Sequence, residues 1–350
     1  MNPPIGVFIP NVAHKMEAKM NTYVQSFERV NWKEIIRKYQ VPDLPKAVGQ
    51  ILTSVVPYIG MMILMYFTLD FSYWWTLLLA LPAAGFFVRT FIIFHDCGHQ
   101  SFFGSKNKKA NDILGVITGL LTFTPYHFWR RSHAKHHATV AKLDQRGKGD
   151  VWMMTIDEWN EANKWKKLTY RVYRNPLILF TIGAWFNIIL AQRIPFPGMD
   201  PQDKRSILLT DIALLIIAVS LSLLIGWKAY LLIQMPVIMI ASSAGVWLFY
   251  IQHQFPGAYW ARDDEWDYLK ACMQGSSFYQ LPEILRFFTG NIGFHHLHHL
   301  SHLVPNYHLP ILFTKHPELA VKPITLWDTR KLLGIRLYDE AKGGYVGFPA

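Results

Sequence analysis

The sequence predicts an all-α integral membrane protein with four transmembrane helices in two hairpins and additional interfacial helices. Two properties of the composition and one pattern along the chain support this. The 350 residues are 51% hydrophobic and only 17% charged, which is too apolar for a disordered chain. The chain is nevertheless basic, with a net charge of +11, and this combination is typical of a membrane protein that faces anionic lipid. The pattern is a set of four long apolar stretches.

The four stretches are each long enough for a helix to cross a bilayer, which takes about 20 residues. They are residues 47–69, 73–94, 207–225 and 229–251. Short loops separate the first pair and the last pair, so each pair predicts a tight helical hairpin. Two further apolar stretches, residues 112–125 and 176–194, are less suited to cross a bilayer.

The distribution of Lys and Arg predicts the orientation in the membrane. Of the 35 basic residues, only Lys228 lies in a hairpin loop. The positive-inside rule then places both termini and the long middle loop in the cytosol, in a multi-pass protein of the cell membrane. A crossing by residues 176–194 would put the nine Lys and Arg after residue 251 outside, so we expect that stretch to be an interfacial helix.

The same map divides the chain into three parts. Residues 1–46 are expected to form a cytosolic N-terminal arm, with an amphipathic surface helix over residues 21–40. Residues 47–310 form the membrane domain, and residues 311–350 a cytosolic C-terminal tail. The two cysteines, Cys97 and Cys272, give no disulfide framework.

Three clusters of histidine lie beside span ends or in loops on the predicted cytosolic side. They occupy residues 95–99, 133–137 and 295–299, and a further histidine follows the fourth span. On a helix, positions i, i+3 and i+4 share one face, so the histidines of each cluster are expected to bind one centre together. The nine candidate ligands are His95, His99, His133, His136, His137, His253, His295, His298 and His299.

Nine imidazoles predict two metal ions, each with an open position, because a structural zinc takes four ligands and a catalytic one takes three and a water. Imidazole suits zinc, copper, iron and nickel, so the residue type alone does not name the metal. We therefore expect a cytosolic helical cap that holds a histidine-rich dimetal site, with no catalytic residue beyond the ligands. His296 points off the shared face and is not included, and the isolated histidines at 14, 127, 308 and 316 are read as ordinary polar residues.

Charged and polar neighbours of the clusters suggest supporting roles. Asp96 is placed to accept the outer N–H of a ligand histidine. Arg89 lies two helical turns before Asp96, so it either pairs with that carboxylate or extends to the interface. His302 follows His298 at i+4 and is either a neighbour of the ligands or a surface residue.

Motifs of several other site classes are absent from the sequence. It contains no Glu-x-x-His pair, no His-Glu-x-x-His, no Gly-x-Ser-x-Gly and no glycine-rich phosphate loop. The basic residues lie on loops beside apolar spans, which favours contact with lipid or a protein partner and not with nucleic acid.

At the histidine clusters the chain resembles the membrane fatty acid desaturases. That family carries three boxes, His-x(3–4)-His and two of His-x-x-His-His, and residues 47–310 match their order and the hairpin layout. The flanking runs IIFHDCGHQSF (residues 92–102) and GNIGFH (residues 290–295) resemble the bacterial acyl-lipid (phospholipid) branch of the Bacillus type. The acyl-CoA branch usually has Asn four residues before the additional histidine, where this chain has Phe249. This departure favours the acyl-lipid branch and leaves one iron position unassigned, for which Asn291 is a candidate.

The resemblance implies a di-iron enzyme that uses O₂ as co-substrate and inserts a cis double bond into acyl chains of membrane phospholipids. It also implies two external electrons from a soluble donor such as ferredoxin or flavodoxin. Residues 95–175 hold 14 Lys and Arg against 7 Asp and Glu, which suits docking of an acidic carrier and equally suits anionic headgroups. Asp150 and Trp152, after the second box, are candidates for the substrate entrance, although an aromatic interface belt explains Trp152 as well.

Two other functions remain as alternatives. Membrane di-iron hydroxylases and ketolases use similar clusters to insert oxygen into a lipid or hydrocarbon. A metal transporter is less favoured, because transporters place ionisable ligands near the middle of the bilayer, whereas the predicted spans hold only Arg89 and Asp211 as charges.

Overall fold

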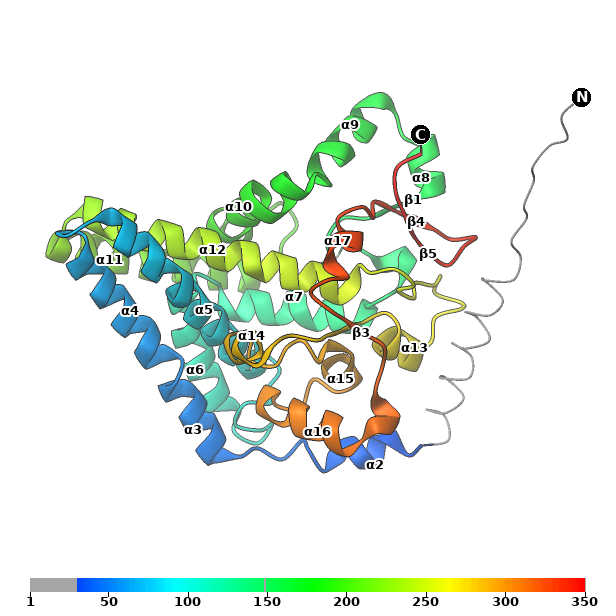
Figure 1. Ribbon diagram of the computed structural model, residues 1–350, viewed down its shortest axis with the longest axis horizontal. Coiled ribbons are helices and arrows are strands. Elements are labelled where there is room, and N and C mark those ends of the chain that lie inside the picture. The colour runs from blue at the N-terminus through cyan, green and yellow to red at the C-terminus, as the bar shows by residue number, and fades with distance from the viewer. Residues whose placement is uncertain (1–29, 148, 350) are drawn as a thin grey trace, which may run out of the picture.

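The computed structural model describes residues 30–147 and 149–349, and it confirms the four predicted spans (Figure 1). Four helical segments in this part of the chain are long and apolar enough to cross a membrane: Leu44–Thr68, Tyr73–Gly98, Pro201–Ile225 and Trp227–His253. The first consists of α3 (Leu44–Leu52) and α4 (Val55–Thr68), and the others are α5, α11 and α12. The turns of both hairpins lie at one end of the molecule, on the left in Figure 1.

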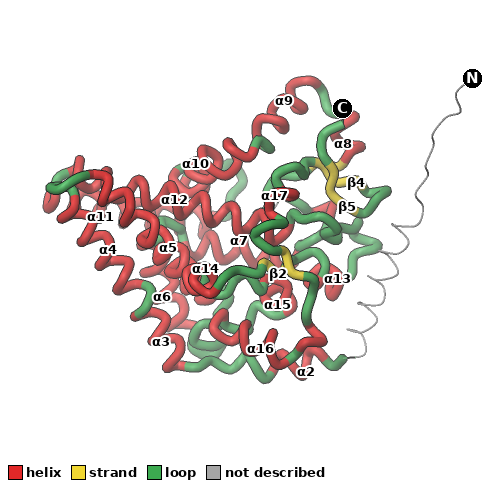
Figure 2. The backbone as a smooth tube through the Cα atoms, viewed as in Figure 1, coloured by secondary structure: helices red, strands yellow, loops and turns green. Residues whose placement is uncertain are grey.

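The remaining elements are short, and most lie toward the opposite end (Figure 2). The other α-helices are α2 (Trp32–Arg37), α6 (Lys108–Leu121), α7 (Tyr126–Thr139), α8 (Ile156–Glu161), α9 (Lys164–Tyr173), α10 (Gly183–Ile189), α13 (Tyr268–Met273), α14 (Glu283–Phe288), α15 (His295–Leu300), α16 (Leu309–Lys315) and α17 (Thr329–Leu332). Within the described residues, one π-helical turn, η2 (Ile178–Ile182), and four 3₁₀ turns connect them: η1 (Leu143–Gln145), η3 (Ala191–Arg193), η4 (Asn306–His308) and η5 (Pro317–Leu319).

The two hairpins each contribute one inner and one outer helix. Within the most apolar stretch of each span, 50% of the residues of α5 and 39% of those of α12 are buried, against 17% and 11% in the first and third spans. α5 packs against α4, α6 and α12. The inner helices, α5 and α12, are therefore the two that carry histidines at their C-terminal ends. The outer spans present apolar side chains to the surroundings.

Local sequence explains where the hairpins turn. The Ser72 side chain accepts a hydrogen bond from the Trp74 backbone N–H and caps the start of α5. Between α11 and α12, Gly226 adopts φ +87°, a conformation that costs glycine little because it lacks a Cβ. A single residue thus reverses the chain between two helices of 25 and 27 residues.

The stretch predicted as an interfacial helix, residues 176–194, is not a straight spanning helix. It contains η2, α10 and η3, and it meets α9 at an angle of 67°. α10 packs along α12. By length and composition, α9 and the segment from η2 to η3 could together count as a fifth, bent span. The placement of residues 176–194 at the interface stays a prediction.

The predicted fold class is confirmed, and the end of the molecule opposite the hairpin turns, which we call the cap, contains short strands beside its helices. A three-stranded sheet has the order β1 (Met154–Thr155), β4 (Leu337–Asp339), β5 (Gly344–Val346), with β1 parallel and β5 antiparallel to β4. β2 (Phe278–Tyr279) pairs in parallel with β3 (Pro323–Ile324). Strands of two or three residues are too short to leave an alternating pattern in the sequence.

Both predicted terminal regions contact the cap. Segment 311–350 supplies β3, β4 and β5 to the two sheets. Of the helix predicted over residues 21–40, α2 forms part, and residues 21–29 lie outside the described residues. Ile36 of α2 is buried in an apolar cluster that includes Leu297 and Leu300 of α15.

Candidate metal centre

Four helices bring the candidate ligands to one place in the cap. α5 ends beside the cap with His95 in its last turn and His99 as its C-cap residue. His253 is the last residue of α12, and His295 the first of α15. α7 supplies the second cluster from its C-terminal half. Residues from distant parts of the sequence therefore meet where α5, α7, α12 and α15 converge (Figure 1).

All nine histidines predicted from the sequence fall into two groups. Within each group, one ring nitrogen of every member lies within 4.8 Å of those of the other members. The five-histidine group consists of His95, His99, His133, His137 and His298. The four-histidine group consists of His136, His253, His295 and His299.

The expectation that each cluster binds one centre is wrong for the second and third clusters. His133 and His137 belong to the five-histidine group, whereas His136 belongs to the other. In the third cluster, His295 and His299 stay together and His298 crosses to the five-histidine group. Neighbouring residues on a helix point about 100° apart, so the i, i+4 pairs share a direction and the i+3 member turns toward the second group.

The ring nitrogens face one another inside the groups at distances that fit a shared cation. In the four-histidine group, His253 Nε2 lies 3.2 Å from His136 Nε2 and 2.9 Å from His295 Nε2. His299 Nε2 lies 3.0 Å from His295 Nε2. In the five-histidine group, His137 Nε2 lies 3.2 Å from that of His133 and 3.1 Å from that of His298.

Acceptors on the outer side fix the tautomer of three of these rings. His95 Nδ1 lies 3.0 Å from Asp96 Oδ1, His136 Nδ1 lies 2.7 Å from Asp150 Oδ1, and His253 Nδ1 lies 3.4 Å from the Gly275 carbonyl oxygen. Each acceptor takes the Nδ1–H, which leaves a lone pair on Nε2 pointing inward. His136 and His253 therefore turn two lone pairs toward each other, and a metal ion between them fits where a hydrogen bond does not.

Burial keeps the other rings neutral, the form that binds metal. Removal from water and repulsion from the neighbouring histidines lower the pKa of His99, His133 and His137 well below 6.5. The same two causes lower the pKa of His295, His298 and His299 well below 6.5. The donor set, its protonation and its geometry all fit metal binding.

Asp96 orients His95 and is itself held in place. Its Oδ2 accepts hydrogen bonds from the backbone N–H of Asn306 at 2.7 Å and from Asn306 Nδ2 at 2.8 Å. The Asn291 side chain donates to the Asn306 carbonyl oxygen at 3.2 Å. Asn291, the candidate for the unassigned iron position, therefore contacts Asn306, the residue that holds Asp96. Nothing in the sequence marks Asn306, which is 210 residues from Asp96.

Of the two alternatives for Arg89, the pair with Asp96 is wrong, because the described contacts of this carboxylate are with His95 and Asn306. Arg89 instead donates to the Phe287 carbonyl oxygen. Its guanidinium group also lies 3.9 Å from the centre of the Phe287 ring. Arg89 thus ties the inner helix α5 to α14, beside the cap.

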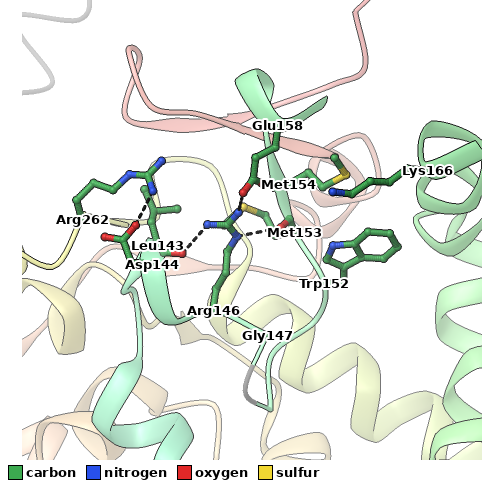
Figure 3. A pocket seen from close by; sticks show the side chains of 10 residues that line it. All are labelled: Leu143, Asp144, Arg146, Gly147, Trp152, Met153, Met154, Glu158, Lys166 and Arg262. Carbon is green, nitrogen blue, oxygen red and sulfur yellow. Dashed lines mark hydrogen bonds and ion pairs between the residues drawn. The ribbon is translucent and has the colours of Figure 1, made fainter. Parts of the chain in front are cut away.

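The two residues expected at the substrate entrance have different surroundings. Asp150 contacts His136, so it supports a candidate ligand. Trp152 packs edge-to-face against Tyr170, with ring centres 4.9 Å apart. It also lines a cavity of about 390 Å³, which Asp150 does not line (Figure 3). Ion pairs of Arg146 with Glu158 and of Arg262 with Asp144 make this cavity polar, unlike a passage for an acyl chain.

The histidines outside the two groups vary in their proximity to the site. The exposed His302 lies beside it, with its ring 5.0 Å from that of His99 and 5.6 Å from that of His137. His296 is fully buried but turns away toward Phe278 and Phe313, and burial lowers its pKa to about 3. Leaving His296 out of the ligand set agrees with this geometry.

Three features of the site are not among the site residues that the sequence predicts, although Phe249 is noted there as a departure from the acyl-CoA branch. The carbonyl group that holds His253 belongs to Gly275, where a Cβ would lie 2.6 Å from the Ala271 oxygen. The Phe249 ring lies 5.2 Å from both His136 and His253. The third feature is the buried Arg174.

Arg174 links three segments around the site. It donates to Gln254 Oε1 at 2.5 Å, next to His253, and to the Trp152 carbonyl oxygen at 3.3 Å. It also donates to the Ile335 carbonyl oxygen at 3.2 Å. The guanidinium group thereby ties the end of α12, the loop after the second cluster and the C-terminal segment together.

The fold and the site define a membrane protein of four apolar spans whose cap holds two histidine groups suited to metal ions. A family model described as fatty acid desaturase matches residues 72–330. The chain belongs to the fatty acid desaturase family, and the desaturase activity predicted from the sequence is confirmed.

Individual relatives agree with this. A fatty acid desaturase of Bacillus subtilis is 44% identical over 90% of this chain and 89% of its own length. An sn-1 acyl-lipid omega-3 desaturase (ferredoxin) of Synechocystis is 28% identical over 68% of this chain and 65% of its own length. An sn-1 oleoyl-lipid 12-desaturase of Anabaena variabilis is 26% identical over 78% of this chain and 77% of its own length.

Proposed function

We propose that this enzyme inserts a cis double bond into acyl chains of membrane phospholipids, using O₂, two non-haem iron ions and two external electrons. The observation that carries the proposal is the convergence of nine imidazoles in two adjacent groups. The named relatives that act on acyl lipids support the choice of substrate.

The overall reaction sets what the site must provide. Two neighbouring methylene groups each lose one hydrogen, and O₂ takes up these two hydrogens, two electrons and two protons to give two waters. Iron bound at the histidine groups would supply the O₂-derived oxidant that an unactivated C–H bond requires. The protein's own side chains would bind the two ions, orient the histidine rings and shield the site from water.

Each histidine group has residues that serve these purposes. His95, His99, His133, His137 and His298 would hold one ion, and His136, His253, His295 and His299 the other. Asp96, Asp150 and the Gly275 carbonyl group hold their histidines in one orientation by accepting the Nδ1–H. Such outer acceptors preserve geometry and raise ligand basicity. Phe249 covers the four-histidine group with an apolar ring, which excludes water on that side.

The substrate and the electron donor reach this site from different directions. The acyl chain approaches from the lipid phase, between the spans that end at the histidines. The two electrons come from a soluble carrier, ferredoxin or flavodoxin, at the face that holds the histidine groups. The excess of basic residues over residues 95–175 supports docking of an acidic carrier there. The name of the Synechocystis relative, which includes ferredoxin, agrees.

The proposed orientation places both termini and the histidine groups in the cytosol. The charge distribution supports it, because among the basic residues only Lys228, in the first turn of α12, lies beside a hairpin turn. The hairpin turns lie at the end of the molecule away from the cap (Figure 1). A reporter fused after residue 350 should be accessible only from the cytosolic side.

Expression in a host that makes only saturated lipids tests the activity. Mass spectrometry of the lipid extract should show phospholipids lighter by two hydrogens, with the double bond in the acyl chain. A gain of one oxygen would instead identify a hydroxylase, and an unchanged lipid extract combined with metal uptake would identify a transporter.

A further inference from the structure

The two histidine groups differ in how far they are open to solvent. In the four-histidine group every member is buried, with exposed fractions of 1% for His136, 5% for His253, and 2% each for His295 and His299. In the five-histidine group His133 and His137 are only partly buried. Both groups consist of imidazole rings, so the difference in exposure to solvent comes from the residues that cover each group.

A surface opening leads to the five-histidine group. It has a volume of about 220 Å³, and three of the five histidines line it: His99, His133 and His137. Gln100, Arg130 and the exposed His302 are polar residues of its wall. Trp129 stacks on His133 with ring centres 4.3 Å apart, so one wall is packed directly on a ligand. The opening therefore leads from the surface to the edge of the five-histidine group.

The four-histidine group is buried throughout. Its members do not line the opening. Phe249 lies against His136 and His253 on the side of α12. Exchange of anything bound there requires local displacement of packed residues, and such opening is slow when many buried contacts must break.

We propose that the five-histidine site exchanges its metal ion with solvent through this opening, gated by His302, while the four-histidine site is kinetically closed. This rests on the proposed function, since it assumes one ion at each site. The ligand that passes is a hydrated divalent cation, Fe²⁺. His302 lies at the opening and near two ligands, so the size of its side chain sets the width of the route.

Anaerobic release of iron to a chromophoric ferrous chelator tests the proposal on the purified full-length protein loaded with Fe²⁺. We expect two phases of equal amplitude, one ion per chain each, with rates that differ by about tenfold or more, because only the slow phase waits for local opening. Two ions released in a single phase would overturn the unequal access and leave the proposed function intact. A total of one ion per chain would overturn both.

Two variants at His302 assign the fast phase to the opening. His302→Ala should speed the fast phase severalfold and His302→Trp should slow it, and neither should change the slow phase. The matched control is His127→Ala, which removes an exposed histidine of α7 that does not line the opening. If both phases respond equally to the His302 variants, or if His127→Ala has the same effect, the gate is not at His302.

A variant at the four-histidine site tests the slow phase of iron release independently. Phe249→Ala should speed the slow phase and leave the fast phase unchanged, because it uncovers His136 and His253 only. Phe249→Leu, which keeps the site apolar and filled, should leave both rates close to those of the parent. A slow phase unaffected by Phe249→Ala would contradict the closure that we assign to this ring.

Discussion

The two histidine groups are built from the same residue type by different geometry. The five-histidine group contains two i, i+4 pairs, His95 with His99 and His133 with His137, and it opens to solvent. The four-histidine group contains one such pair, His295 with His299, and two histidines from other helices. It is buried throughout.

The difference shows how one sequence motif supplies histidines to both groups. In each His-x-x-His-His cluster the first and last histidines stay together, and the middle one turns to the other group. Each of the two helices, α7 and α15, thereby contributes to both groups. Two groups that share their helices in this way are held at a fixed separation by the helix backbones.

The largest expected effect is the loss of activity on removal of a ligand. His136→Ala should abolish the unsaturated product, because it removes one of only four ligands and leaves the Asp150 carboxylate without its N–H partner. His296→Ala is the matched control, since it also removes a buried histidine of the cap, but one that turns away from both groups. Mass spectrometry of the lipids measures both. Retained product with His136→Ala would remove this residue from the ligand set.

Removal of an outer acceptor should have an intermediate effect. Asp150→Asn keeps the shape but weakens the acceptor, and loss of such a partner typically lowers metal affinity or activity about 10–100-fold. We expect the loss of affinity only at the four-histidine site, and Asp96→Asn should produce it only at the five-histidine site. Iron titrations of the two variants measure this. Equal weakening of both sites by either variant would show that the groups are not separable.

The sequence predicts the spans and the ligands more completely than the arrangement around them. Hydropathy identifies all four spans because each needs about 20 apolar residues in a row. The nine candidate ligands are recognisable because imidazoles at helical spacing are unusual. Asp150 could not be recognised as a partner of His136, since a loop of irregular backbone joins them and Gly149 within it has φ +89°. The acceptor of His253 is a backbone carbonyl group, which every residue has.

Removal of the metal should make stability depend on pH. Burial lowers the pKa of the six histidines named above, His99, His133, His137, His295, His298 and His299, well below 6.5. As pH falls below about 6.5, the unfolded chain therefore takes up protons that the folded, metal-free protein does not, and the free energy of unfolding decreases.

We expect this decrease to be at least about 1 kcal/mol per pH unit between pH 6.5 and 5, and to be several times smaller between pH 8 and 7, where few histidines of the unfolded chain are protonated. Thermal unfolding of the metal-free protein in detergent measures it. A transition temperature that is constant from pH 8 to 5 would mean that these rings are not buried without metal.

The smallest effect is expected at a histidine far from both groups. His316→Ala removes a surface contact with Glu318, in which His316 Nδ1 lies 2.8 Å from the Glu318 oxygen, and such pairs contribute about 0–1 kcal/mol. The iron content and the product should be unchanged. Loss of iron in this variant would mean that histidines outside the two groups take part in binding.

The iron content of the parent and of the neighbouring variants His136→Ala and His137→Ala tests the central claim most directly. We predict two ions per chain in the parent. His136→Ala should lose the ion of the four-histidine site, and His137→Ala should weaken the five-histidine site alone, although the two residues are adjacent in the sequence. A fully active parent with a single ion per chain, or the same site emptied by both variants, would contradict the division of the nine histidines into two metal sites.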